Sequence, residues 1–314
     1  MALTAPPRVV GTSRAVGEIA RSRWYAHRWN RSGYYRLAAA VAAPLPRRAR
    51  LGLAVVLARA LRARFRNECR MVRTNIARVA PGATGPARDA LVADVFRHFA
   101  ICFADLVSSN RSPATLERLL AGVVGEEHLT AASREGRGLV VLTAHLGNWE
   151  LAGRLLALRS ARPTHVVVAA EADPRVERFL RAGPAPVRFL ARTRPTDVLA
   201  LVSALRRNEI VAMQGDRALG GRGDVAAPFF GGNASFPLGP FVLARAAGSP
   251  LVPAFCVLGR DRRYTISVGE PIRVGTHGEP GALAGWVRVL EDAVRAHPEQ
   301  WFNFFDVWGD GAAG

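Results

Sequence analysis

The 314-residue chain has no lysine, only three cysteines and no long apolar run, and each absence excludes something. Cys69, Cys102 and Cys256 are odd in number and far apart, so the sequence predicts neither a disulfide framework nor a zinc knuckle. No stretch reaches the roughly 18 uninterrupted apolar residues of a membrane span. Because residues 1–14 also lack the apolar run of a signal peptide, we expect a protein of the reducing cytoplasm.

The positive charge is concentrated at the beginning of the chain. The formal net charge is +18, and residues 1–78 hold 17 arginines against two acidic residues, Glu18 and Glu68. Arginine clusters attract phosphate, whether on nucleic acid or on anionic lipid. Since the sequence contains no zinc finger, RNA-binding aromatic motif or helix-turn-helix pattern, it predicts no nucleic-acid partner and favours an anionic membrane surface.

Residues 1–80 are predicted to be a basic, amphipathic helical segment that associates with a membrane. We interpret residues 1–32 as a flexible or partly helical arm, and residues 49–80 as one helical pattern with arginines on one face. Its apolar stripe consists of Leu57, Leu61, Phe65, Cys69, Val72 and Ile76. This pattern is typical both of an interfacial membrane helix and of a surface helix packed on a core, and both can hold along different parts of it.

The rest of the chain, residues 81–314, is predicted to be one α/β domain. Short apolar runs alternate with helical patterns after residue 138, which indicates a mixed, mostly parallel sheet flanked by helices. The predicted strands are 139–142, 165–169, 187–190, 210–213, 251–257 and 264–268. The predicted helices are 89–110, 116–121, 149–159, 175–181, 195–207, 238–247 and 283–296.

One segment combines the residues needed for acid–base chemistry. A buried strand ends at Thr143, and His145, Asn148 and Glu150 follow it directly. Asn148 is a good N-cap, so His145 is expected in a strand-to-helix turn at the carboxyl end of a strand, where ligands bind in open α/β sheets. Glu150, in the first helical turn, can then fold back and hold one ring nitrogen while the other accepts a proton. A lone histidine near a turn is more often structural, but this dense polar cluster favours function.

The stretch from Thr143 to Glu150 resembles the His-x4-Glu/Asp motif of the glycerolipid acyltransferase superfamily. Its form is similar to the branch that contains the lipid A late acyltransferases and the phosphatidylinositol mannoside acyltransferases. Further matches follow in order at Asn75 and in residues 214–217, 228–231, 237–254 and 297–302. The resemblance covers about residues 35–308 and implies a glycerolipid acyltransferase-like fold.

The resemblance also implies a reaction. A fatty acyl chain would pass from acyl carrier protein or acyl-CoA, as co-substrate, to a hydroxyl of a lipid or glycolipid at the cytoplasmic face of the inner membrane. His145 and Glu150 would be the catalytic dyad, with no other cofactor and no metal. Asn148, Asp216, Arg217 and Arg222 are predicted to bind substrate, the two arginines by holding phosphate.

The acceptor and the reaction class stay open at this point. The arginine that the lipid A enzymes tend to carry after the catalytic helix is missing from residues 167–171, which read Val-Val-Ala-Ala-Glu. A hydrolase could use the same dyad to activate water, although the absence of a Gly-x-Ser-x-Gly motif argues against an α/β-hydrolase. A non-catalytic basic membrane-surface or nucleic-acid-binding protein is the third interpretation.

Overall fold

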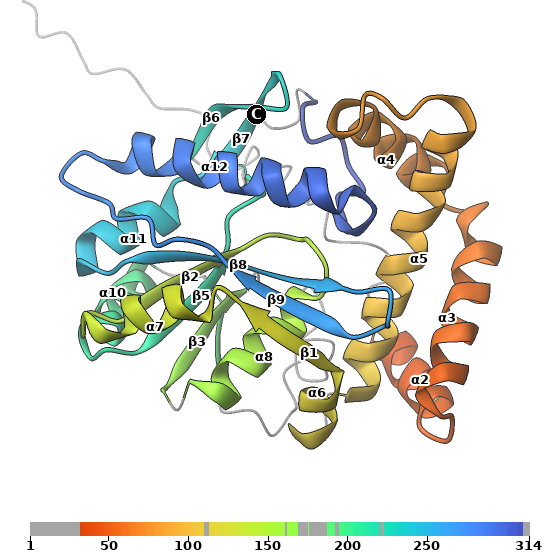
Figure 1. Ribbon diagram of the computed structural model, residues 1–314, viewed down its shortest axis with the longest axis horizontal. Helices are drawn as coiled ribbons and strands as arrows, with labels where there is room; N and C mark the ends of the chain where they lie inside the picture. Colours follow the sequence, from red (N-terminus) through yellow and green to blue (C-terminus); the bar gives the residue numbers. More distant parts are fainter. Residues whose placement is uncertain are drawn as a thin grey trace, which may run out of the picture.

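A computed structural model of the chain describes residues 32–109, 113–160, 162–168, 175, 187–191, 195–218, 220 and 223–309. The described residues form a seven-stranded sheet in the order β1-β9-β8-β2-β5-β3-β4 (Figure 1). All neighbouring strands in it are parallel except β8 and β9. Its strands are β1 (Leu120–Val124), β2 (Leu139–Thr143), β3 (Thr164–Val168), β4 (Val187–Ala191), β5 (Ile210–Gln214), β8 (Leu251–Leu258) and β9 (Tyr264–Val268). The mixed, mostly parallel sheet confirms the predicted α/β class.

Helices cover both faces of the sheet, which is why its central strands read as continuous apolar runs. Along β2, Val140 and Leu142 join the large core cluster on one face, while Leu139 and Val141 join a smaller cluster on the other. Helices α10 (Pro195–Arg206), α11 (Gly239–Ala247) and α12 (Glu279–Ala296) contact strands on the first face. Helices α7 (Glu126–Arg134) and α8 (Trp149–Arg159) contact the second.

The remaining helices lie on one side of the sheet (Figure 1). They are α2 (Ser32–Ala42), α3 (Arg47–Arg62), α4 (Arg66–Val79), α5 (Gly85–Ser109) and α6 (Pro113–Leu119). The long helix α5 separates α2 and α3 from the sheet and contacts α2, α3 and α4. Among the described residues, no helix is both long and apolar enough to cross a membrane.

The prediction of one continuous helix over residues 49–80 is wrong. The chain leaves α3 after Arg62 through a tight turn, in which the amide of Phe65 bonds to the carbonyl of Arg62, and α4 then begins in a new direction. The two halves of the predicted stripe consequently face different surroundings. Leu57 and Leu61 of α3 are exposed, whereas Val72 and Ile76 of α4 are buried in the main core.

Other elements depart from the prediction at points where the chain gives little local signal. The helix predicted to end at residue 121 ends at Leu119, because Leu120 already pairs with Tyr264 in β1. Strand β1, helix α7 and the hairpin of β6 (Asp224–Phe229) and β7 (Gly232–Pro237) were not predicted. The arm up to residue 31 and most of the predicted helix 175–181 lie outside the described residues. The predicted boundary at residue 80, between the N-terminal segment and the α/β domain, stays a prediction.

Candidate active site

The turn between β2 and α8 lies where the sequence placed it, at the carboxyl end of a central strand. Gly147 has a φ of +62°, and a Cβ there would overlap the carbonyl oxygen of Cys256 in β8, so this position requires glycine. The amide of Asn148 bonds to that same carbonyl at 2.7 Å. Strand β8 therefore holds the turn from one side.

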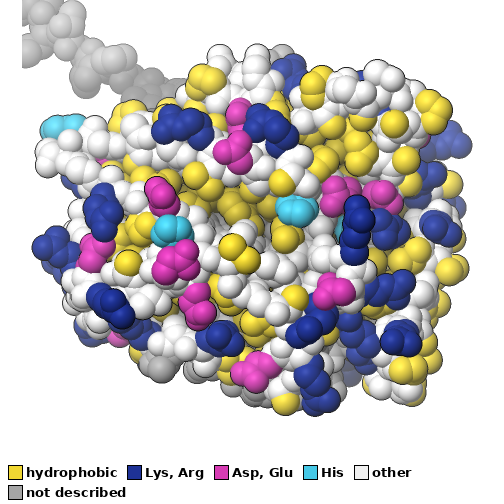
Figure 2. All heavy atoms as spheres, in the orientation of Figure 1, with side chains coloured by type: hydrophobic (Ala, Val, Ile, Leu, Met, Phe, Trp, Pro, Cys, Tyr) yellow, Lys and Arg dark blue, Asp and Glu magenta, His cyan; other side chains and the backbone are white. Residues whose placement is uncertain are grey.

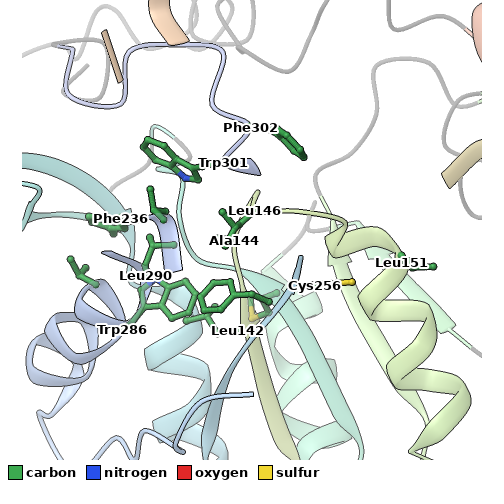
Figure 3. Close-up of a cluster of buried hydrophobic side chains, with 14 of the residues drawn as sticks. Leu142, Ala144, Leu146, Leu151, Phe236, Cys256, Trp286, Leu290, Trp301 and Phe302 are labelled. Carbon is green, nitrogen blue, oxygen red and sulfur yellow. The ribbon is translucent and has the colours of Figure 1, made fainter. Parts of the chain in front are cut away.

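The C-terminal segment holds the turn from the other side. The amide of Gly147 donates to the carbonyl of Gln300 at 2.9 Å, and the amide of Phe302 donates to the carbonyl of His145 at 2.8 Å. Figure 3 shows Trp301 and Phe302 beyond Leu146, at the end of the strand that carries Leu142. Backbone hydrogen bonds on both sides thus fix the position of the His145 backbone, independently of the contacts of its side chain.

The side chain of His145 is paired with a buried carboxylate. Its Nδ1 lies 2.7 Å from Oδ1 of Asp216, and its backbone amide donates to Oδ2 of the same residue at 3.0 Å. The Asp216 side chain is fully buried, and that of His145 is 13% exposed. Because an ionised carboxylate only accepts hydrogen bonds, Nδ1 carries the ring proton and Nε2 keeps its lone pair. The arrangement presents Nε2 as a base.

The charges around this pair favour an ionised aspartate and a neutral imidazole. Burial is the largest influence on His145 and lowers its pKa, and the nearby guanidinium of Arg217 lowers it further, against the opposing effect of Asp216. Burial would raise the pKa of Asp216, but the charge of His145, the hydrogen bonds from it and the charge of Arg217 together bring it below its ordinary value. At neutral pH the ring is therefore uncharged and able to accept a proton.

The carboxylate that holds the ring at Nδ1 is Asp216, and not Glu150 as the sequence spacing predicted. Asp216 follows β5, which pairs with β2 in parallel, so the carboxyl ends of the two strands meet at one edge. The amide of Gly215 also bonds to the carbonyl of Thr143, which draws Asp216 toward the turn. Glu150 lies in the first turn of α8, in the wall of a cavity, and its charge acts on the buried guanidinium of Arg154. Asp216 is thus a partner of His145, and the substrate-binding role predicted for it stays a prediction.

Asn148 is buried, and the substrate-binding role predicted for it stays a prediction. Its Oδ1 accepts the amide of Leu151 at 3.2 Å, which confirms it as the N-cap of α8. Its Nδ2 donates to the carbonyl of Cys102 and to the hydroxyl of Tyr264, each at 3.3 Å. Both ends of the amide therefore hold the fold around the turn.

Arg217 is also buried, and the phosphate-binding role predicted for it stays a prediction. Its Nε donates to Oδ1 of Asn303 at 2.6 Å and its Nη2 to the carbonyl of Phe302 at 2.5 Å. Burial lowers its pKa to about 9, against the opposing charge of Asp216. Arg217 thus ties the C-terminal segment to the carboxyl end of β5, while Arg222 lies outside the described residues.

A cavity of about 360 Å³ lies between the sheet and helices α7 and α8. Its wall is largely apolar. Thr143, Glu150 and Gln214 line it where β2, β5 and α8 meet, and further polar residues line it elsewhere, among them Ser133, Arg134, Arg159 and Arg162. Trp149 belongs to this wall and its ring lies 4.8 Å from the imidazole of His145, centroid to centroid. The cavity therefore ends beside the candidate base. Within the described residues, no three His, Cys, Asp or Glu side chains gather in a way that could hold a metal ion.

The model of one family, the bacterial lipid A biosynthesis acyltransferases, matches residues 22–309. The chain belongs to this family. Membership confirms the resemblance inferred from the His145 motif and from the ordered matches around it.

Curated relatives carry two kinds of name. The chain is 30% identical over 203 residues to a phosphatidylinositol mannoside acyltransferase of Mycobacterium tuberculosis strain H37Rv, which covers 62% of this chain and 60% of that protein. It is 24% identical over 233 residues to a lipid A biosynthesis palmitoleoyltransferase of Escherichia coli K12, covering 74% of this chain and 75% of that protein. The chain thus spans about 60% of the length of the mycobacterial relative that it matches.

Proposed function

We propose that this protein is an O-acyltransferase that moves a fatty acyl chain from a thioester to a hydroxyl of a glycolipid or lipid. The observation that carries the proposal is the bond between Nδ1 of His145 and the buried carboxylate of Asp216, beside an apolar cavity. A neutral imidazole held in this way is a general base, and the cavity offers room for an acyl chain. The family to which the chain belongs supports the same reaction.

In the proposed reaction Nε2 of His145 takes the proton of the acceptor hydroxyl while the oxygen attacks the thioester carbonyl carbon. Asp216 stabilises the imidazolium that forms and holds the ring in one tautomer. The carbon–sulfur bond then breaks, and the thiol leaves with the proton that the imidazolium returns. A new ester and a free thiol result, and His145 is neutral again for the next cycle.

The cavity suits the acyl chain because of its shape and position. Its wall includes both Gln214, the last residue of β5, and Ile210, the first. It therefore extends along the strand for about 13 Å, at roughly 3.3 Å per residue. A chain seated here with its carbonyl beside Trp149 and His145 would extend its methyl end along β5 toward Ile210.

Gly153, in the middle of α8, is expected to set the length of chain that this cavity accepts. A methyl group at this position would meet Cγ2 of Val166 at 3.4 Å, which is ordinary contact, but a larger side chain would project into the cavity. We expect Gly153→Leu to lower kcat/KM for long-chain relative to short-chain acyl thioesters by roughly 10–200-fold, the range for small steric changes in apolar pockets. A series of acyl-CoA lengths measures this.

Gly153→Ala is the matched control, because it adds a methyl group that fits and favours the helix by up to about 1 kcal/mol. It should keep the wild-type chain-length preference. An unchanged preference in Gly153→Leu as well would place the acyl chain elsewhere.

The two kinds of relative suggest the acceptor class. Phosphatidylinositol mannosides and lipid A are both glycolipids, so the acceptor proposed for this chain is a hydroxyl of a membrane glycolipid. The donor proposed is an acyl thioester of acyl carrier protein or coenzyme A.

The decisive experiment gives the purified protein a labelled acyl thioester and glycolipid acceptors in vesicles. Labelled acyl-glycolipid supports the proposal, whereas labelled free fatty acid as the sole product would indicate a hydrolase.

The surface of α2 and α3 is proposed to rest on an anionic membrane, at its cytoplasmic face. Its exposed apolar residues are Tyr34, Leu37, Val41, Leu53, Val56, Leu57 and Leu61. Exposed arginines of the same region are Arg48, Arg59, Arg62, Arg64 and Arg66. Figure 2 shows hydrophobic and basic side chains interleaved along the right-hand edge, where α2 and α3 lie in Figure 1. Apolar side chains among cations are typical of surfaces that enter the headgroup layer of anionic lipid.

We expect transfer to acceptor in anionic vesicles to fall as salt rises, because salt screens these charges.

A further inference from the structure

A chain of hydrogen bonds runs from the start of α3 toward the turn that carries His145. Arg47, the first residue of α3, donates from Nε to Oδ1 of Asp105 at 2.9 Å and from Nη2 to Oδ2 at 2.7 Å. Asp105 lies in α5, and its side chain is 1% exposed. The hydroxyl of Tyr264, the first residue of β9, donates to Oδ2 of Asp105 at 2.9 Å. The buried carboxylate is thus shared between a helix at the surface and a strand of the sheet.

Asn148 continues this chain into the catalytic turn. Its Nδ2 donates to the hydroxyl of Tyr264, and its Oδ1 caps the amide of Leu151 in α8. Because a carboxylate only accepts and a phenol has one proton to give, the direction of each of these bonds is fixed. Four side chains, those of Arg47, Asp105, Tyr264 and Asn148, therefore connect the first residue of α3 to the N-cap of the helix that follows His145.

Because Asp105 is buried, this chain of hydrogen bonds tolerates little displacement of its members. A buried carboxylate such as Asp105 requires its charge partner and its hydrogen bonds, since neither can be replaced by bulk water. Arg47 also donates from Nη2 to the carbonyl of Arg262, in the turn between β8 and β9, at 2.7 Å. A displacement of the start of α3 would therefore disturb Asp105, the β8–β9 turn and, through Tyr264, the position of Asn148.

The opposite face of α3 carries the residues proposed to meet lipid. Leu53, Val56 and Leu57 are exposed on the helix whose first residue enters the buried chain. We propose that Arg47, Asp105 and Tyr264 are positioning residues that couple α3 to the turn of His145, so that contact of α3 with a lipid surface is transmitted to that turn. The inference rests on the proposed acyl transfer at a membrane, and it adds a way in which the membrane regulates the reaction.

Two neighbouring arginines provide a matched pair of variants. Arg47→Gln and Arg48→Gln remove the same charge from adjacent positions of α3, but Arg48 is exposed, whereas Arg47 bonds to Asp105. Tyr264→Phe is a milder variant, which keeps the pair of Arg47 and Asp105 and removes only the hydroxyl between Asp105 and Asn148. It keeps the test possible if Arg47→Gln does not fold.

The experiment measures hydrogen–deuterium exchange of peptides covering residues 143–151 in the full-length protein, with and without phosphatidylglycerol vesicles. Vesicle binding is measured by sedimentation in the same samples. We expect wild type to bind and to change exchange in this turn. Arg48→Gln removes one arginine of the lipid-facing surface, so it should bind more weakly, but its turn should still respond when vesicles are bound. Arg47→Gln and Tyr264→Phe should bind equally well, because the outer face of α3 is unaltered, but their turn should no longer respond. The proposal is overturned if the wild-type turn does not respond to bound vesicles, or if it still responds in both variants.

Kinetics give a second readout. Vesicles should raise the wild-type kcat by about 5–150-fold, the usual range for coupling between two sites, and Arg47→Gln should lose this rise while its KM for the acyl thioester is unchanged. A network that only stabilised the fold would lower the melting temperature and leave the vesicle response intact, which would also overturn the proposal. If wild type transfers no acyl group, the proposed function fails, whereas the exchange measurement still decides whether α3 and the turn are coupled.

Discussion

Replacing His145 by alanine is expected to lower kcat for acyl transfer by about 10²–10⁴-fold, the range for loss of general-base assistance. In the structure Nδ1 of this ring is paired with Asp216, and we propose that Nε2 accepts the proton of the hydroxyl. The substitution removes the proposed base. Transfer of labelled acyl groups from a thioester to glycolipid in vesicles measures the effect.

An exposed histidine serves as the control for this variant. His277 lies on a surface turn with a φ of +54°, so His277→Asn removes an imidazole while keeping a residue type that tolerates this conformation. It should retain wild-type transfer. His145→Ala should also keep a melting temperature near that of wild type, because the turn is held by the amides of Gly147 and Asn148 and by the carbonyl of His145. Full activity in a folded His145→Ala protein would exclude the proposed base.

Asp216→Asn is expected to have the second large effect, again lowering kcat by about 10²–10⁴-fold. An asparagine side chain has no charge to stabilise the imidazolium that forms during transfer. Its amide can also turn and donate to Nδ1, which would move the ring proton to Nε2 and remove the base. Glu150→Gln is the comparison that separates the two carboxylates. Asp216 holds Nδ1 in the structure, so we expect the larger loss in Asp216→Asn. A larger loss of kcat in Glu150→Gln than in Asp216→Asn would indicate that Glu150 orients the ring.

The pH dependence of the same variants follows from the pKa of His145. Burial and Arg217 lower this pKa, so wild-type kcat/KM should rise with pH through a midpoint below about 6.5, the ordinary value for histidine. Below the midpoint the ring is protonated and cannot accept the hydroxyl proton, and above it the ring is a base. Because Asp216 opposes the lowering, Asp216→Asn should move the midpoint to still lower pH. A midpoint above the ordinary value would contradict the charge arrangement in the structure.

The position of His145 could be predicted from sequence because its signals are local. The run from Leu139 to Thr143 is apolar at every position up to its last residue, as a strand buried on both faces requires, and Asn148 marks the start of the next helix. The other strands of the seven-stranded sheet except β1, and the helix that follows His145, were predicted for the same reason. The tight turn was foreseeable, and Gly147 confirms it, since the approach of Cys256 leaves no room for a side chain.

The partner of His145 could not be predicted in this way. Asp216 lies 71 residues further along the chain, and its contact with the ring depends on β5 being the neighbour of β2 in the sheet. The order of strands is set by packing across the whole domain and not by local pattern. Arg217 was assigned to phosphate for a similar reason. Its acceptors in the structure, Asn303 and the carbonyl of Phe302, belong to the C-terminal segment, and no local pattern indicates that this segment lies beside Arg217.

The boundary between α3 and α4 shows a limit of periodicity itself. Neither proline nor glycine occurs between Arg62 and Arg66, so nothing local marks the break. The apolar spacing continues across it, although Leu61 faces outward and Val72 faces the core. Periodicity identifies a face of a helix, but the surroundings of that face are decided by packing against α5. Of the two alternatives left open for the stripe, packing on the core describes α4, whereas contact of α3 with a membrane stays a proposal.

The protonation state of the His145 ring is the most direct test of its proposed role as the general base. Uniform ¹⁵N labelling of the seven histidines, with the His145→Ala spectrum to assign the resonance, reports which ring nitrogen carries the proton as the pH changes. We expect a neutral ring at pH 7 that is protonated at Nδ1 and unprotonated at Nε2, with a pKa below the ordinary value for histidine. A ring protonated at Nε2 at that pH, or one that is charged, would contradict it.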